Sequence, residues 1–155
     1  MMVLEHSNIA RLYEYFKTDK ELLLSMENLS GGTLEARLQE MGGCFSPEDA
    51  VVALRQMLRA LLCCHMHDMV HRDLKADNYI YAMPSSNSNK ALKLIDFGLS
   101  LECKGNQTLR AGAGTIPASA PEVLAGGSGA GLSANTFVQG NEVRCLVGTG
   151  YGITY

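Results

Sequence analysis

Residues 46–69 form a long stretch of the sequence that can make one amphipathic helix. Ser46 is followed by Pro47 at the first helical position and by Asp49 three residues after the serine, a pattern typical of a capping box. Apolar residues then recur at helical spacing: Val51, Leu54, Leu58, Leu61, Leu62 and Met66. Because a stripe of this kind is buried in a globular domain, we expect a core helix from Ser46 to Met69.

Shorter elements flank this helix. Residues 9–26 show a strand pattern on each side of a polar turn, which predicts a β-hairpin. After Gly31–Gly32, apolar residues at helical spacing predict a short helix that stops at Gly42–Gly43. Three short strand-like pieces follow the long helix, at residues 70–71, 79–81 and 91–95.

The C-terminal part of the sequence has a different character. Residues 123–155 carry only Glu142 and Arg144 as charged residues, and they are interrupted by glycine throughout. No helix of useful length fits such a sequence. We therefore expect one domain over residues 1–124 and a poorly ordered tail over residues 125–155.

Composition restricts the class of partner. The 155 residues are 46% hydrophobic, as in a globular domain, and their net charge of -3 provides no basic surface for nucleic acid. No run approaches the roughly 18 apolar residues that span a bilayer, so a membrane is not an expected partner either. The five cysteines form no CxxC pair, which favours reduced thiols and a cytoplasmic location, with the nucleus as the alternative.

The densest group of polar side chains is the octapeptide His71–Asn78, followed by Asp96–Phe97–Gly98. Together these segments supply carboxylates, a lysine and an asparagine. Phosphoryl transfer uses such groups: a carboxylate orients a hydroxyl nucleophile, an ammonium offsets phosphate charge, and hard oxygen ligands hold Mg²⁺. The two segments therefore predict a phosphoryl-transfer site.

Residues 71–78 match the pattern H-R-D-L-x-x-x-N, and residues 96–98 match D-F-G, so the chain resembles the protein kinase family. Further segments resemble kinase motifs in the same order along the chain. Residues 4–9 resemble the entry to the fourth strand of the N-lobe, and residues 26–29 resemble the gatekeeper and hinge. Gly114–Thr115 and Ala120–Leu124 resemble the end of the activation segment, so that about three-quarters of the chain is covered.

This resemblance implies an α+β fold, in the form of a partial protein-kinase-like domain. It would consist of the N-lobe hairpin, the hinge and a helical C-lobe core, followed by a disordered or irregular tail. Lys75 resembles the serine/threonine branch of the family. Residues 96–100 and 120–124 resemble the calcium/calmodulin-dependent group, although the sequence has no calcium loop of the D-x-D-x-D-G type.

The resemblance also implies roles for individual residues. Asp73 would be the catalytic base and Lys75 the contact to the transferred phosphate. Asn78 and Asp96 would be the Mg²⁺ ligands, and Thr115 would hydrogen-bond to the catalytic pair.

The same resemblance implies ATP and Mg²⁺ as cofactors. Glu27 and Leu29 would bind the adenine through their backbone, Met26 would limit the depth of the pocket, and Ile80 would lie beneath the base. The expected partners are a protein substrate with a Ser or Thr acceptor and a regulatory protein.

Several parts of a whole kinase do not occur in these residues. The glycine-rich phosphate loop, the strand lysine and its helix glutamate are absent, and Gly148–Gly152 is one residue short of G-x-G-x-x-G. Thr33 stands where an acidic residue often contacts a basic substrate, while Asp77 retains a second such contact. The sequence thus predicts a truncated kinase domain that is inactive alone.

Other interpretations remain open. The chain could be a pseudokinase-like interaction module without catalytic activity, or a small metal-dependent hydrolase that uses Asp73 and Asp96. Asp77 taken alone is more typical of a turn. The histidines and cysteines of the long helix point in different directions, which favours core and surface positions over a metal cluster: Cys63, Cys64, His65 and His67.

Overall fold

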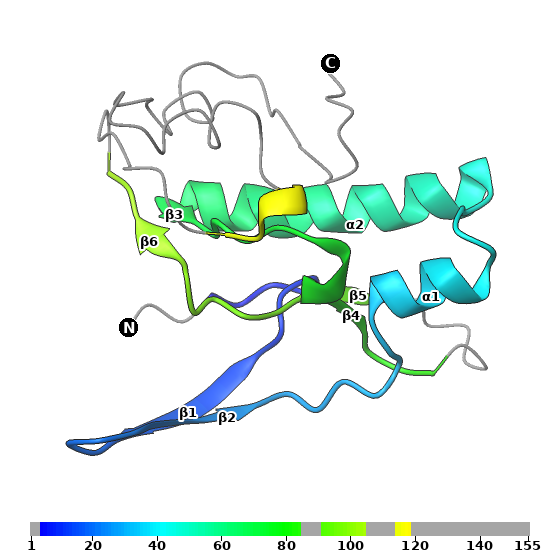
Figure 1. Ribbon diagram of the computed structural model, residues 1–155. Coiled ribbons are helices and arrows are strands. Elements are labelled where there is room, and N and C mark those ends of the chain that lie inside the picture. The colour runs from blue at the N-terminus through cyan, green and yellow to red at the C-terminus, as the bar shows by residue number, and fades with distance from the viewer. Residues whose placement is uncertain (1–3, 85–90, 105–113, 119–155) are drawn as a thin grey trace. The chain divides into compact units, whose positions relative to one another are not determined.

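The computed structural model describes residues 4–84, 91–104 and 114–118. The chain divides into two compact units, and each is described by itself. Unit 1 comprises residues 1–63 and 77–95, and unit 2 comprises residues 64–76 and 96–155. The described residues contain two α-helices, six short strands and two 3₁₀ turns (Figure 1). This agrees with the predicted α+β class, but the helical part of the described residues is smaller than we expected.

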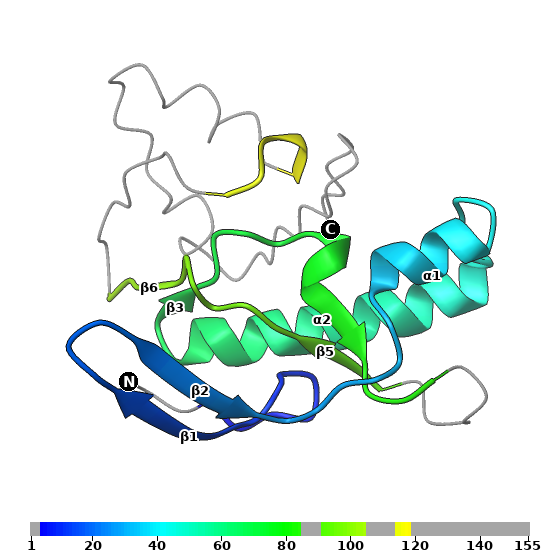
Figure 2. The same ribbon diagram turned by 60° about the horizontal axis from the view of Figure 1, so that its bottom comes forward.

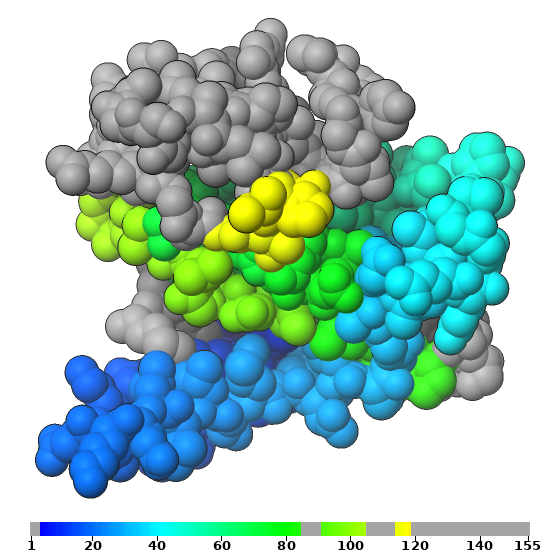
Figure 3. Space-filling view, in the orientation of Figure 1, coloured from blue at the N-terminus to red at the C-terminus, as the bar shows by residue number. Residues whose placement is uncertain are grey.

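Strands β1 (Leu12–Lys17) and β2 (Leu22–Met26) form the predicted antiparallel hairpin, with Leu12 opposite Met26 and Lys17 opposite Leu22. The Thr18 hydroxyl closes the turn by accepting the Glu21 amide at 3.0 Å. Both faces of the hairpin carry exposed apolar side chains, of which Tyr15 is 50% and Leu23 55% exposed. In the space-filling view the hairpin belongs to the blue part of the surface (Figure 3).

Helix α1 (Leu34–Glu40) begins at Thr33, whose hydroxyl oxygen accepts the Ala36 amide at 3.0 Å as an N-cap. The helix ends at Glu40 and is capped by Met41, and the next residue, Gly42, has a left-handed φ of +80°, which glycine adopts without strain. The short helix and its glycine stop are as predicted. The sequence pattern assigned Thr33 only to a lost substrate contact and missed its capping role.

Helix α2 (Pro47–Met66) is the longest helix of the described residues (Figure 1). Its predicted cap is present, because the Ser46 hydroxyl accepts the Asp49 amide at 3.2 Å and donates to the Asp49 carboxylate at 3.1 Å. The predicted C-terminal end was wrong by three residues: Asp68 has a φ of +55°, which stops the helix.

The predicted apolar stripe of α2 was also partly wrong. Val51, Leu62 and Met66 are 54%, 51% and 75% exposed. The buried face instead combines the small residues Ala53, Ala60 and Cys64 with the larger residues Met57 and Leu61. Small residues let the backbone of a neighbouring segment approach closely, so this face packs inward although the other face carries larger apolar groups.

Strand β5 (Leu92–Leu94), labelled in Figure 2, is paired on one side with β4 (Tyr79–Tyr81) in antiparallel register. On its other edge, Leu94 accepts the Ala10 amide at 2.9 Å and donates to the Asn8 carbonyl at 2.8 Å. Leu92 and Leu94 are 1% and 0% exposed, so this strand is the middle of the core.

The segment that follows the hairpin is held against the outer edge of β4. The Gly31 amide donates to the Tyr81 carbonyl at 2.9 Å, and the Tyr81 amide donates to the Gly32 carbonyl at 3.0 Å. A Cβ on Gly31 would lie 2.2 Å from the Met83 carbonyl oxygen, so only glycine fits this approach. Residues 27–29, the hinge segment, lie just before this attachment.

Unit 2 contains a small sheet that the sequence did not predict in full. Strand β3 (Met69–Val70) pairs with β6 (Leu101–Glu102) in antiparallel register, and the Cys103 amide donates to the Asp68 carbonyl at 2.7 Å. None of the described helices is both long and apolar enough to cross a bilayer. The predicted boundary at Leu124 and the tail over residues 125–155 lie outside the described residues.

Candidate active site

The predicted catalytic loop, residues 71–78, begins directly after β3 in unit 2. His71 is 2% exposed, its Nδ1 accepts the Asp73 amide at 3.3 Å, and its ring meets the Phe97 ring edge-on with centroids 5.0 Å apart. Arg72 has a φ of +69°, and its Nε donates to the Leu99 carbonyl at 2.6 Å. A positive φ is costly for arginine, so these contacts hold the loop in a strained conformation that presents Asp73.

Asp73, Lys75 and Thr115 form a compact hydrogen-bonded cluster. The Thr115 amide and hydroxyl both donate to Asp73 Oδ1, at 2.9 and 2.7 Å. Lys75 Nζ lies 3.0 Å from Asp73 Oδ2 and donates to the Thr115 hydroxyl oxygen at 2.8 Å. The threonine therefore donates to the carboxylate and accepts from the ammonium, which is the contact that the family resemblance implied.

This cluster fixes one carboxylate orientation within unit 2. The Asp73 side chain is 9% exposed and the Lys75 side chain 27%, so their attraction is less screened by water than that of a surface pair. Charge-assisted hydrogen bonds of this length are strong and directional. A carboxylate held in this way can accept a proton from a hydroxyl, while the lysine supplies positive charge beside it.

The two predicted metal ligands are placed as follows. Asn78 ends the 3₁₀ turn Ala76–Asn78 in a buried position, 5% exposed, and its carbonyl accepts the Ile95 amide at 2.9 Å. Asp96, the next residue after Ile95, belongs to unit 2 and is exposed. It has a φ of +60°, and its Oδ1 accepts the Gly98 amide at 3.2 Å.

The predicted adenine contacts belong to unit 1. The hinge segment follows β2, and the Glu27 amide donates to the Arg11 carbonyl at 2.8 Å. No described residue accepts a hydrogen bond from the Leu29 amide. Ile80 is the central residue of β4 and is half-buried, while Met26 at the end of β2 is 39% exposed.

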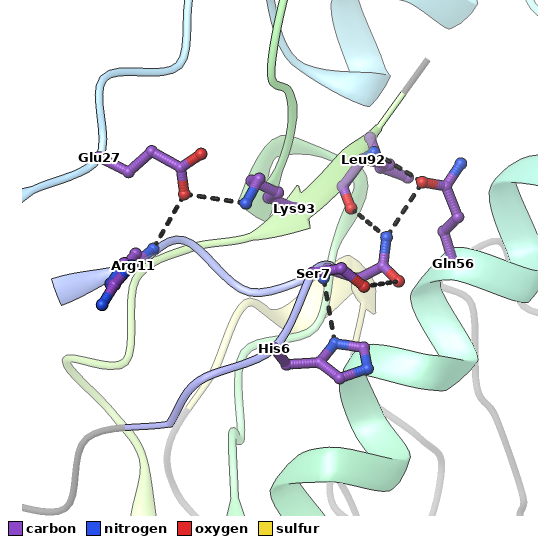
Figure 4. A network of polar contacts seen from close by, with 8 residues as sticks. His6, Ser7, Arg11, Glu27, Gln56, Leu92 and Lys93 are labelled. Carbon is purple, nitrogen blue, oxygen red and sulfur yellow. Dashed lines mark hydrogen bonds and ion pairs between the residues drawn. The ribbon is translucent and has the colours of Figure 1, made fainter. Parts of the chain in front are cut away.

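The Glu27 side chain lies between two elements of unit 1 (Figure 4). Its Oε2 is 2.9 Å from Lys93 Nζ on β5 and accepts the Arg11 amide at 3.1 Å. Partial burial by itself raises the pKa of Glu27, but the hydrogen bonds from Lys93 and Arg11 and their charges outweigh it and lower this pKa below the usual value. The carboxylate is thus kept charged.

A second polar group in Figure 4 ties α2 to β5. Gln56 Oε1 accepts both the Leu92 amide at 2.8 Å and the Asn8 side-chain amide at 3.0 Å, and the latter also donates to the Leu92 carbonyl at 2.8 Å. Sequence reasoning missed this network and the Glu27–Lys93 pair. The partners are far apart in the chain, and no local pattern indicates them.

The two cysteines and the histidine of α2 are buried or partly buried. Cys64 is buried, and burial raises the pKa of the Cys63 thiol and lowers the pKa of His65. Within the described ranges, no three histidine, cysteine or acidic side chains are grouped so that they could hold a metal ion.

Comparison with known proteins shows the family of the chain. The sequence model of the protein kinase domain family matches residues 1–146, so the chain belongs to this family. The chain is 40% identical over 119 residues to calcium/calmodulin-dependent serine/threonine-protein kinase 1 of Oryza sativa subsp. japonica, a match that covers 77% of this chain. It is 39% identical over 126 residues, or 81% of this chain, to human calcium/calmodulin-dependent protein kinase type IV.

A CDPK-related kinase of Arabidopsis thaliana is 36% identical over 119 residues. The predicted family and its calcium/calmodulin-dependent group are therefore confirmed as the proteins that this chain resembles. The matched part spans 20% of the rice protein and 26% of the human protein. The chain thus corresponds to about a quarter or less of these relatives.

Proposed function

We propose that the chain is the catalytic-loop part of a protein serine/threonine kinase, which transfers the γ-phosphate of ATP to Ser or Thr hydroxyls of protein substrates. The observation that carries the proposal is the Asp73 carboxylate, held by two hydrogen bonds from Thr115 and by the ammonium of Lys75. Asp73 accepts the proton of the substrate hydroxyl, and Lys75 offsets negative charge on the transferred phosphate.

The residues present fit a Mg²⁺–nucleotide. The amide oxygen of Asn78 and the carboxylate of Asp96 are hard oxygen ligands, and Mg²⁺ in nucleotide sites is typically held by one or two such side chains together with phosphates. When bound, the metal neutralises charge on the phosphates. The proposed adenine contacts are the backbone of Glu27 and Leu29, with Met26 and Ile80 bordering the base.

We propose further that these 155 residues by themselves transfer phosphate poorly. Phosphoryl transfer depends on positioning, and the sequence before the hinge segment has no glycine-rich loop to cover the β- and γ-phosphates. The cysteine pattern supports a cytoplasmic location, with the nucleus as the alternative. The names of the relatives support a regulatory protein of the calmodulin type as partner.

The test compares ATP-dependent phosphorylation of a basic Ser/Thr peptide by the 155-residue chain and by the longest protein that its gene encodes in frame. The longer protein should be active, and Asp73→Asn should lower its kcat by about 10²- to 10⁴-fold, the usual contribution of a catalytic base. Asp68→Asn is the control, because Asp68 is exposed in the same unit and asparagine tolerates its φ of +55°. An Asp73→Asn protein as active as wild type would refute the proposed chemistry.

A second pair of variants tests the role of Thr115. Thr115→Val removes the hydroxyl that joins Asp73 and Lys75, whereas Thr115→Ser keeps it. Valine should lower kcat by about tenfold or more, and serine should restore most of it. Equal kcat for both variants would show that the hydroxyl has no part in the reaction.

A further inference from the structure

We infer that the Glu27–Lys93 ion pair positions the hinge backbone for adenine recognition. The inference rests on the proposed function and adds two positioning side chains to it. Neither residue needs to touch the nucleotide with its side chain. Lys93 acts through Glu27, and Glu27 acts through its own backbone.

The first argument is the placement of Lys93. In the β4–β5 register Lys93 is directly opposite Ile80, the residue proposed to lie beneath the adenine. Cross-strand partners project to the same face of a sheet, so Lys93 and Ile80 share one face. From there, the Lys93 ammonium reaches the Glu27 carboxylate at 2.9 Å. The pair therefore connects the strand beside the proposed base floor to the hinge segment.

The second argument is the way in which Glu27 is held. Its amide donates to the Arg11 carbonyl at 2.8 Å, and its Oε2 accepts the Arg11 amide at 3.1 Å. Backbone and side chain of Glu27 are thus bound to one residue of the neighbouring segment, while Lys93 fixes the same carboxylate oxygen from β5. These contacts leave little freedom for the Glu27 peptide group, whose carbonyl the adenine amino group would meet.

The third argument is burial. The side chains of Lys93 and Glu27 are 13% and 25% exposed, whereas those of Lys104 and Glu102, which form an ion pair at 2.7 Å, are 68% and 58% exposed. An exposed ion pair contributes little, but removal of one member of a largely buried pair leaves a charge without compensation. Loss of Lys93 should consequently move Glu27, while loss of Lys104 should change almost nothing.

The experiment measures Mg–ADP and Mg–GDP binding to the 155-residue chain by calorimetry. Lys93→Met should raise the Kd for ADP about tenfold and reduce the preference for ADP over GDP several-fold, because the displaced carbonyl no longer selects an amino group. The conservative variant Lys93→Arg keeps a positive charge for the Glu27 carboxylate and leaves its bond from the Arg11 amide in place, so it should retain most of the wild-type affinity and preference. The control Lys104→Met should change Kd less than about twofold. Wild-type affinity and base preference in Lys93→Met would overturn the inference.

Amide hydrogen exchange separates this inference from the proposed function. In Lys93→Met, the Glu27 amide should exchange about tenfold faster than in wild type, since its hydrogen bond to Arg11 loses support. Unchanged exchange would overturn the positioning role whatever the chain binds. Suppose instead that the wild-type chain binds neither nucleotide, while the Glu27 amide still exchanges faster in Lys93→Met. Lys93 would then hold Glu27 in place, but adenine recognition, the purpose assigned to the pair, would be refuted.

Discussion

Of the two small sheets of unit 1, the one with the shorter strands has the more deeply buried side chains. In the β4–β5 pair, with three residues in each strand, Tyr79, Leu92 and Leu94 are at most 1% exposed. In the longer β1–β2 hairpin, Tyr15 and Leu23 are 50% and 55% exposed. Hydrogen-bonded pairing alone therefore does not bury side chains. The stability of unit 1 should depend on β4–β5, because a two-stranded hairpin with open faces is marginally stable.

The largest difference is expected between two leucine truncations. Leu94→Ala removes a side chain that is 0% exposed and should lower the free energy of unfolding by about 3 to 4 kcal/mol. Leu23→Ala removes one that is 55% exposed and should change it by less than about 0.5 kcal/mol. Both changes in unfolding free energy are measured by urea unfolding that is monitored through amide exchange of the unit 1 backbone. Equal losses would mean that the hairpin belongs to the same core as β5.

A somewhat smaller effect is expected where the chain is pressed against β4. Gly31→Ala places a Cβ 2.2 Å from the Met83 carbonyl oxygen, so the backbone must shift, and we expect a loss of about 2 to 3 kcal/mol. Gly42→Ala meets no atom within 4 Å and should cost about 1 kcal/mol, from its positive φ alone. The same unfolding measurement would contradict this account if the two variants were equally destabilised.

The polar attachment of β5 to α2 should matter less than its packing. Gln56→Leu leaves the Leu92 amide without its side-chain acceptor and removes one of the two acceptors of the Asn8 side-chain amide, so it should cost about 1 to 2 kcal/mol. Gln39→Leu is the matched control, because its bond to Glu35 on α1 is exposed and is worth only a few tenths of a kcal/mol. Slower exchange at Leu92 in Gln56→Leu than in wild type would be incompatible with the proposed network.

The same comparison explains what the sequence could predict. The hairpin, α1 and α2 were predicted because each has a local pattern of several residues, such as the polar turn near Thr18 or the cap at Ser46. Strand β6 has two residues and pairs with β3, so no periodicity could reveal it. The buried face of α2 was misjudged because large apolar residues were weighted above the small residues Ala53 and Ala60, which are 7% and 0% exposed.

The candidate site also has contacts that the sequence could predict and contacts that it could not. The motif of residues 71–78 predicted Asp73, Lys75 and their bond to Thr115, because the family resemblance carries such contacts with it. The Glu27–Lys93 pair joins residues 66 positions apart and belongs to no motif. Contacts of this kind depend on tertiary packing, and only the structure shows them.

The smallest expected effect is a change in pH dependence at Glu27. Its pKa in the folded chain is lowered below the usual 4.5, because the bonds from Lys93 and Arg11 outweigh partial burial. A carboxyl with a lowered folded pKa contributes stability that is present above its unfolded pKa. This contribution is lost as the pH falls through the folded pKa. Unfolding free energies should therefore decrease from about pH 5 downwards, in part because of this one residue.

Glu27→Gln should remove that part of the decrease, so that its unfolding free energy depends less on pH below about pH 5. The difference from wild type should be well under about 1 kcal/mol, since the carboxylate is partly exposed. Urea titrations between about pH 3 and 6 give the two profiles. A steeper acid decrease in Glu27→Gln than in wild type would require the opposite pKa shift. It would also remove the argument that Lys93 holds a charged Glu27 at the hinge.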